Sequence, residues 1–200
     1  VNDIAPEFTS DATFSAAENQ TAIGTVTATD TEGDDITFTV SGSELAITSA
    51  GVLTFVSAPD YETKTAYSAT VTANDGNNPS TQAITVKVTN VNDIAPEITS
   101  TDSFTVLENQ TYISTLTAND IEGDILNFSV SGLELEITPK GVLTFKEEPN
   151  YEIKSNYTAT VSVSDGVHLV IQDIIINIAD EIEGHQRWMK VSSMQNNFIE

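Results

Sequence analysis

Acidic and amide side chains recur in this sequence at spacings that suit the binding of a cation. The recurring groups are the Glu-Asn pairs beginning at Glu18 and Glu108, the Asp-x-Glu pairs Asp30/Glu32 and Asp120/Glu122, the triplets Asp60-Tyr61-Glu62 and Asn150-Tyr151-Glu152, the dipeptides Asp75-Gly76 and Asp165-Gly166, and Asn92-Asp93. Alternate residues of an extended chain share a face, so each Asp-x-Glu presents two carboxylates on one side. Calcium takes six to eight oxygen ligands. Several such groups at one end of a domain could supply these ligands, and they predict calcium coordination.

The chain as a whole is strongly acidic and lacks cysteine. Thirty Asp and Glu residues face seven Lys and Arg residues, which gives a formal net charge of −23 over 200 residues. Nucleic acid and anionic membranes would repel such a surface, so neither is an expected partner. For glutamates scattered outside the recurring groups, solubility is the simpler explanation. Without cysteine there are no disulfides, and bound calcium could stabilise the chain in their place.

The sequence contains an internal repeat of 90 residues. Val-Asn-Asp-Ile-Ala-Pro-Glu stands at residues 1–7 and again at residues 91–97. A 90-residue shift aligns the sequence with itself without a gap through residue 180, and roughly half of the aligned positions are identical, which indicates tandem domains. We therefore predict one domain over residues 1–93 including its preceding linker motif, a second over residues 94–180, and a non-repeat tail over residues 181–200.

Within each repeat, apolar and polar residues alternate with a period of two. The alternation covers residues 36–40, 67–73 and 84–88, and their counterparts 126–130, 157–163 and 174–178, with glycines between the runs. Such strands bury one face and expose the other, which suits a sandwich with one buried side and one solvated side. We predict an all-β chain with about seven strands per repeat, of the immunoglobulin-like type.

Aromatic residues recur at matching positions of the two repeats. The pairs are Phe14/Phe104, Phe38/Phe128, Phe55/Phe145, Tyr61/Tyr151 and Tyr67/Tyr157. Recurrence at strand positions favours packing in the core over a platform for stacking sugars. Outside these pairs, only Tyr112 and Trp188 are candidates for glycan contact.

Five of the acidic and linker motifs together resemble those of cadherin repeats. Glu18-Asn19 is similar to the first-strand Pro-Glu-Asn motif, and Asp60-Tyr61-Glu62 to Asp-Arg-Glu. Residues 91–96 resemble the Asp-x-Asn-Asp-Asn-Ala-Pro linker, although Asn90 and Ile94 replace its first Asp and second Asn. Asp120-Ile121-Glu122 resembles Asp-x-Asp, and Asp165-Gly166 resembles the late Asp-x-Gly signature. The resemblance covers residues 1–180 and implies two tandem seven-stranded Greek-key sandwiches of the cadherin type.

The resemblance also implies a set of calcium ligands, because cadherins hold three Ca²⁺ ions at each junction between consecutive domains. The implied junction ligands are Glu18, Asp60, Glu62, Val91, Asn92, Asp93, Ile94, Asp120, Glu122 and Asp165, with backbone carbonyls near Val91 and Ile94. A partial N-terminal half-site would comprise Asn2, Asp3, Asp30, Glu32 and Asp75. A partial C-terminal half-site would comprise Glu108, Asn150 and Glu152.

The function implied by the resemblance is that of a calcium-dependent adhesion or spacer module, in which Ca²⁺ at the junction rigidifies a rod. Expected partners are further cadherin-like repeats of the same chain, a second copy, or cell-surface glycans. The longest apolar runs have the length of strands, so no membrane insertion is expected. Because no signal peptide is recognisable, we interpret the chain as an interior piece of a longer secreted or cell-surface protein. Its acidic, Thr- and Asn-rich style suggests a bacterial adhesin.

Two other classes of function compete with this interpretation. Paired carboxylates also serve glycosidases, but these pairs recur once per domain, and His168 and His185 have no counterpart in the other repeat. We therefore expect no enzymatic activity. A carbohydrate-binding module of a polysaccharide-associated protein is the alternative, supported by Tyr112 and Trp188 alone. Residues 184–200 fit no strand of the repeat and could be part of a further domain, a capping segment or a cloning remnant.

Overall fold

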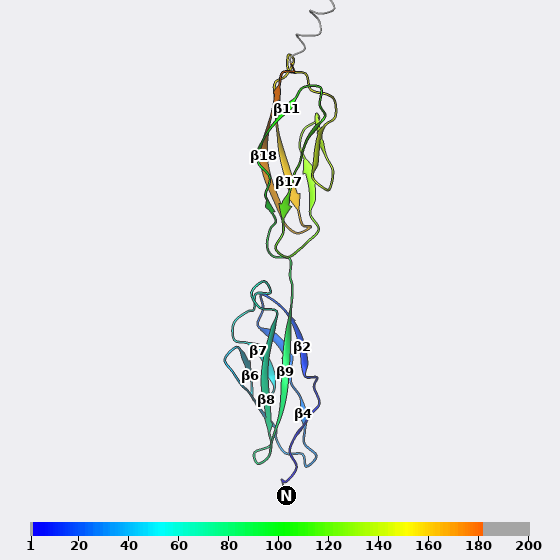
Figure 1. Ribbon diagram of the computed structural model, residues 1–200. Helices are drawn as coiled ribbons and strands as arrows, with labels where there is room; N and C mark the ends of the chain where they lie inside the picture. Colours follow the sequence, from blue (N-terminus) through cyan, green and yellow to red (C-terminus); the bar gives the residue numbers. More distant parts are fainter. Residues whose placement is uncertain (1, 182–200) are drawn as a thin grey trace, which may run out of the picture. The chain divides into compact units, whose positions relative to one another are not determined.

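The computed structural model describes residues 2–181, which fall into two compact units that divide between Asn92 and Asp93. The predicted tail, including Trp188 and His185, lies outside the described residues apart from Glu181. The described residues contain no helix of the length and apolar character needed to cross a membrane. Each unit is built from strands and is considered by itself below (Figure 1).

The strands of the two units follow each other at the same 90-residue interval as the sequence repeat. The first unit comprises β1 (Glu7–Phe8), β2 (Thr13–Ala17), β3 (Ala22–Thr25), β4 (Ala28–Thr29), β5 (Thr37–Val40), β6 (Leu45–Ile47), β7 (Val52–Phe55), β8 (Ala66–Asn74) and β9 (Pro79–Thr89). The second comprises β10 (Glu97–Ile98), β11 (Ser103–Leu107), β12 (Tyr112–Thr115), β13 (Ala118–Asn119), β14 (Asn127–Val130), β15 (Leu135–Ile137), β16 (Val142–Phe145), β17 (Asn156–Ser164) and β18 (Leu169–Ala179).

Two larger sheets form the sandwich in each unit. In the first unit a four-stranded sheet has the order β2-β9-β8-β5 and a three-stranded sheet has the order β3-β7-β6. The second unit repeats both as β11-β18-β17-β14 and β12-β16-β15. These sheets hold the seven strands per repeat that the sequence predicts, and two-residue ladders, β1-β4 and β10-β13, lie beside them. The all-β, immunoglobulin-like architecture is therefore confirmed.

The alternation of apolar residues produces the core of each unit. The buried members of the two long strands are Val71, Ala73, Ile84, Val86 and Val88 in the first unit and Tyr157, Ala159, Val161, Val163, Ile174, Ile176 and Ile178 in the second. Leu53 and Leu143, on the opposing three-stranded sheets, are fully buried against them. Each unit therefore buries an apolar core of its own, which is the dominant favourable term in folding.

The recurring aromatic residues mostly pack in these cores. The rings of Phe55 and Tyr67 meet edge to face with centroids 5.0 Å apart, and those of Phe145 and Tyr157 repeat the contact at 4.8 Å. The ammonium groups of Lys64 and Lys154 lie over the two tyrosine rings. Tyr112, by contrast, is 55% exposed. The pairing of aromatics thus serves packing, as the sequence predicts, and it leaves few rings for a glycan.

A loop conformation shared by both units places recurring acidic groups at the ends of the strands. Asn19 and Asn109 stand two residues after the ends of β2 and β11 with φ of 62°, in the left-handed region that Asn tolerates better than most residues. The turn lets the amide of Asn19 donate to the carbonyl of Pro59 at 3.0 Å, which draws the Asp60-Tyr61-Glu62 loop towards Glu18. The sequence Glu-Asn therefore works as a unit, in which Asn makes the turn and Glu supplies the carboxylate.

Candidate metal centre

A buried glutamate stands at the end of the first long strand of each unit. Glu18 is 3% exposed, and its two carboxylate oxygens accept hydrogen bonds from the amides of Tyr61 at 2.7 Å and Val91 at 2.8 Å. One side chain thus fastens both the Asp60-Tyr61-Glu62 loop and the segment that follows β9. In the second unit, Glu108 is 4% exposed and repeats the arrangement with the amides of Tyr151 and Glu181.

At Glu108 these contacts favour the ionised carboxylate. The amide of Glu181, followed by that of Tyr151, holds the pKa of Glu108 below its usual range. Backbone donors stabilise the charged form of a carboxyl group more than its burial destabilises it here. The group therefore presents negative charge at neutral pH, as a ligand for a hard cation must.

Each of these glutamates belongs to a group of acidic side chains within its own unit. Carboxylate oxygens of Glu18, Asp60 and Glu62 lie within 4.8 Å of one another. Asp60 is oriented by Thr63, whose amide and hydroxyl donate to its two oxygens at 3.0 Å. In the second unit the corresponding group consists of Glu108, Glu152 and Asp180, because Asn150 replaces Asp60. The amide oxygen of Asn150 instead accepts a hydrogen bond from the amide of Ile153.

A second kind of acidic group lies in the loop that follows β4 in the first unit and β13 in the second. Oδ1 of Asp30 accepts hydrogen bonds from the amides of Glu32, Gly33 and Asp34 at 2.8, 3.0 and 3.3 Å. Oδ1 of Asp120 accepts the amides of Glu122 and Asp124 at 2.9 and 3.2 Å. The loop wraps around one oxygen of the aspartate and brings the next two acidic side chains beside it, within 4.8 Å.

Three carboxylate oxygens of these loops are shielded from solvent and have no hydrogen-bond partner among the described residues. They are Oδ2 of Asp30, Oδ2 of Asp120 and Oδ2 of Asp124. Removing a carboxylate oxygen from water without giving it a partner is costly. Such atoms are expected where a ligand supplies the missing interaction. Three of them in equivalent loops point to an electropositive ligand.

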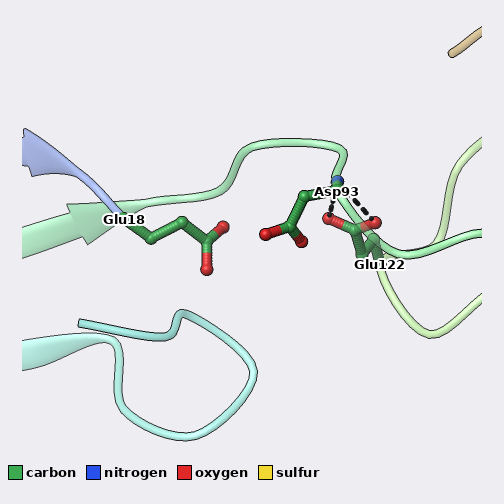
Figure 2. A group of neighbouring side chains, drawn as sticks. All are labelled: Glu18, Asp93 and Glu122. Carbon is green, nitrogen blue, oxygen red and sulfur yellow. Dashed lines mark hydrogen bonds between the residues drawn. The ribbon is translucent and has the colours of Figure 1, made fainter. Parts of the chain in front are cut away.

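The glutamate of each loop holds the linker motif that begins its repeat. Glu122 accepts the amide of Ile94 at 2.8 Å and that of Asp93 at 3.2 Å, as Figure 2 shows for Asp93. Glu32 accepts the amides of Asp3 and Ile4 at 2.8 and 2.9 Å in the same way. The Asp-Ile part of each motif, Asp93-Ile94 and Asp3-Ile4, is therefore held by a glutamate of its own unit. Figure 2 also shows the carboxylate of Glu18, which belongs to the first unit.

The last predicted pair, Asp75 and Asp165, is buried in the turns before β9 and β18. The amides of Asn78 and Asn77 donate to Oδ1 of Asp75 at 2.7 and 2.8 Å. The bond from Asn78 is the main cause of the lowered pKa of Asp75. The side chain of Asn78 also donates to that of Asn2 at 2.8 Å, which joins Asn2 to this turn.

Asp165 repeats the arrangement with one change. Burial acts to raise the pKa of its carboxyl group, but the amides of His168 and Val167 outweigh it and the net pKa is lowered. Nδ1 of His168 lies 3.0 Å from the second carboxylate oxygen. His168 stands where the first repeat has Asn78, so a polar side chain supports this carboxylate in both units.

Within each unit, the structure thus brings together most of the acidic residues that the sequence singles out. The expected carbonyl ligands are a separate matter: Val91 and Ile94 use their amides to bind Glu18 and Glu122, and the role of their carbonyls stays a prediction. Three members of the groups were not predicted, namely Asp34, Asp124 and Asp180. Asp34 and Asp124 could have been found, because they stand four residues after Asp30 and Asp120 and recur at the 90-residue interval.

The chain resembles a known family model and several solved structures. A family model described as a bacterial Ig domain matches residues 92–176, and no curated protein matches the chain. The crystal structure of human protocadherin-24 EC1-2 matches with a TM-score of 0.75 and 18% identity, over 90% of this chain and 99% of that one. Drosophila N-cadherin EC1-4 matches with a TM-score of 0.74 and 20% identity, over 88% of this chain and 50% of that one.

Mouse cadherin-23 EC22-24 matches with a TM-score of 0.69 and 22% identity, over 90% of this chain. The chain spans 66% of that protein fragment and half of the N-cadherin fragment. The likenesses establish the fold: the two units are tandem cadherin-like repeats, as the acidic and linker motifs predicted.

Proposed function

We propose that this chain is a calcium-binding adhesion or spacer module of an extracellular or cell-surface protein, in which Ca²⁺ at the junction fixes one repeat relative to the next. The observation that carries the proposal is the pair of shielded, unpartnered oxygens on Asp120 and Asp124, beside Glu122. In this cadherin-like fold the strands form the sandwich and the acidic groups lie in the loops between them, which is consistent with a spacer.

The donor set fits calcium better than other common metals. The groups found within each unit consist of carboxylates, with no sulfur ligand in a chain that lacks cysteine. Zinc favours nitrogen and sulfur ligands, whereas calcium is bound by carboxylate, carbonyl and amide oxygens in flexible geometry. The unpartnered oxygens of Asp30, Asp120 and Asp124 are donors of this kind. When bound, Ca²⁺ would supply the positive charge that these buried oxygens lack.

The covalent chain supports a junction that draws ligands from both repeats. Glu18 is hydrogen-bonded to the amide of Val91, and Glu122 to the amide of Asp93, only two residues further along. Consecutive Cα atoms are 3.8 Å apart, so the two carboxylates cannot be separated by more than roughly 13 Å at any angle between the repeats. Each repeat therefore contributes a buried or half-buried acidic group next to the same short segment.

Electrostatic repulsion explains why a cation would change the behaviour of the junction. The proposed carboxylates are Glu18, Asp60, Glu62, Asp93, Asp120, Glu122, Asp165 and Asp124. Two like charges ~4 Å apart repel by about 4 kcal/mol at an effective dielectric constant near 20. In the absence of cations the acidic groups of the two repeats would avoid each other, and the repeats would move independently about residues 91–93. Shared ligation would stabilise one angle.

The same half-site recurs 90 residues earlier. Asp30 has a shielded, unpartnered oxygen, and Glu32 holds the linker motif through the amides of Asp3 and Ile4. The side-chain amide of Asn2 donates to the carbonyl of Asp75 at 3.3 Å, and another cadherin-like repeat in a longer chain would complete this half-site. At the other end, Glu108, Glu152 and Asp180 would face a following repeat, with Asn150 providing an uncharged ligand.

Isothermal titration calorimetry on chelator-treated protein tests the proposal. We expect calcium to bind at several sites with dissociation constants of roughly 10⁻⁴ to 10⁻³ M, as in other extracellular modules. A double replacement, Asp120→Asn with Asp124→Asn, keeps the size of both side chains and should weaken the junction sites most. An absence of heat up to several millimolar calcium would reject the calcium role.

A further inference from the structure

The second repeat exposes large apolar side chains on one face where the first repeat exposes small or polar ones. On and just before β18, Val167 is 68% exposed, Leu169 66%, Ile171 65% and Ile175 46%. The residues at the same positions of the first repeat are Asn77, Pro79, Thr81 and Thr85. The two strands have the same length and the same pairing, so the fold does not require these apolar residues.

Strand register places these side chains together on the outer face of the sheet β11-β18-β17-β14. Along β18, Ile174 and Ile176 point into the core and are buried. Leu169, Ile171 and Ile175 stand at the alternate positions and are exposed. Side chains two residues apart lie on one face of a strand, so Leu169, Ile171 and Ile175 form an apolar stripe along β18 that Asp173 interrupts between Ile171 and Ile175. We call the outer face of this sheet the β18 face.

Several polar residues of the β18 face are hydrogen-bonded to one another in pairs. Ser129 and Ser162 share a hydrogen bond of 2.6 Å between β14 and β17, and the side-chain amide of Asn156 donates to that of Asn177 at 2.8 Å. Burying polar groups that already have partners costs much less than burying groups that must abandon water. This face could therefore be covered by another surface at small cost.

Charge is scarce on the β18 face, although the chain carries a net charge of −23. Among the outward-facing positions of the four described strands, Asp173 alone is ionisable, and it accepts a hydrogen bond from the hydroxyl of Thr160 at 2.6 Å. Elsewhere the surfaces of two copies would repel each other. A basic partner would be drawn to the acidic loops instead, so the sparse charge here favours a like-charged partner.

We propose that the β18 face is a self-association surface, which binds the β18 face of a second copy of this chain. Two apolar stripes related by a two-fold axis can cover each other, as in isologous dimers. The strand β18 has 11 residues, so the face is roughly 35 Å long and 15–20 Å wide. This area, on the order of 600 Å², lies below the ~800 Å² that each partner buries in a typical stable complex, so the dimer should be weak.

This inference rests on the proposed adhesive function in one respect, since it names the second copy as the adhesive partner. The contact itself uses no calcium ligand. It should therefore form in chelator as well as in calcium, whereas the junction proposed above should require calcium. The two proposals can fail separately.

Sedimentation velocity of the full 200-residue chain over a range of concentrations, in calcium and in chelator, tests the proposal. We expect a reversible monomer–dimer equilibrium in both. The variant Ile171→Thr with Ile175→Thr installs the residues that the first repeat already carries at these positions, and it should fold normally. It should weaken dimerisation by roughly tenfold or more. Leu133→Ser, a change at a residue that is 89% exposed but off the β18 face, is the matched control and should dimerise like the wild type.

Wild-type protein that stays monomeric at all concentrations would overturn the proposal, and so would a double variant that dimerises as strongly as the wild type. A chain ending at residue 181 gives a third result. If it dimerises while the full chain does not, residues 182–200 cover the face, and the second copy is not its occupant. Normal calcium binding without dimerisation would reject this inference alone, and dimerisation without calcium binding would reject the proposed calcium role alone.

Discussion

The carboxylate of Glu18 accepts a hydrogen bond of 2.8 Å from the amide of Val91, a residue 73 positions later in the chain. The same separation joins Glu108 to the amide of Glu181 in the second repeat. In both repeats the first long strand therefore holds the segment that leaves the last strand. Glu18, which we propose as a calcium ligand, therefore also stabilises the fold by binding the amides of Tyr61 and Val91. These two roles can be separated by experiment.

Replacement of Glu18 by alanine should destabilise the first repeat even in chelator. The change leaves the amides of Tyr61 and Val91 without acceptors in a buried site, which should cost about 2–4 kcal/mol in the free energy of unfolding. Urea denaturation in chelator measures the loss. The control is Glu44→Ala, which removes an exposed ion pair with Lys64 and should cost less than about 1 kcal/mol. Equal losses of unfolding free energy in the two variants would contradict the stabilising role of the Glu18 hydrogen bonds.

Replacement of Gly51 by alanine should destabilise the first repeat more than the same change at Gly42. Both glycines have a φ near +85°, which disfavours any side chain. At Gly51 a Cβ would also overlap the backbone carbonyl of Val26, whereas at Gly42 it would meet open space. Gly42→Ala should cost about 1–2 kcal/mol and Gly51→Ala clearly more. Thermal unfolding of both variants in chelator decides the order, and a reversed order would contradict the packing of this turn.

Removal of calcium should leave both repeats folded. Each repeat buries an apolar core of its own, including Leu53 in the first and Leu143 in the second, so the metal is not needed to form the sandwich. A ligand that binds only the folded state still adds stability by mass action. Far-UV circular dichroism should therefore change little in chelator, while the melting temperature falls. Complete loss of the β-sheet signal would mean that calcium is required for folding.

The sequence predicts the sandwich because the repeat and the period of two are both strong signals. Residues such as Val71 and Ile84 could be assigned to the core from alternation alone, and the structure confirms them. The two-residue ladders β1-β4 and β10-β13 carry no periodicity and could not be foreseen. The exposed apolar residues of β18 were also missed. When apolar residues stand on both faces of a strand, the sequence pattern does not show which of them are exposed.

Most of the acidic residues could be identified from the sequence, but the contacts that bring them together in space were harder to predict. Asp120 and Glu122 stand out through their spacing. The position of Asp124 beside them depends on how the loop wraps around Oδ1 of Asp120. Asp180 was hidden because the linker motif is not repeated around it, and only the contact of the Glu181 amide with Glu108 brings it near that carboxylate. Hydrogen bonds between residues far apart in sequence decide these positions, and sequence spacing does not encode them.

The measurement that tests the central claim most directly compares Asp93→Ala with Asp3→Ala in the 200-residue protein. Both residues stand in an identical Val-Asn-Asp-Ile-Ala-Pro context, and the amide of each is bound by a glutamate of its own repeat. At Asp93 the groups of Glu18 and Glu122 adjoin the same segment, whereas the half-site around Asp3 lacks a counterpart of Glu18. Small-angle scattering with calcium titration reports the length of the particle, and calorimetry reports its affinity. We predict that wild-type and Asp3→Ala proteins become extended and rigid in calcium, while Asp93→Ala binds calcium more weakly and remains flexible. If Asp3→Ala weakens binding as much as Asp93→Ala does, or if Asp93→Ala still becomes rigid, then calcium does not fix the junction between the repeats.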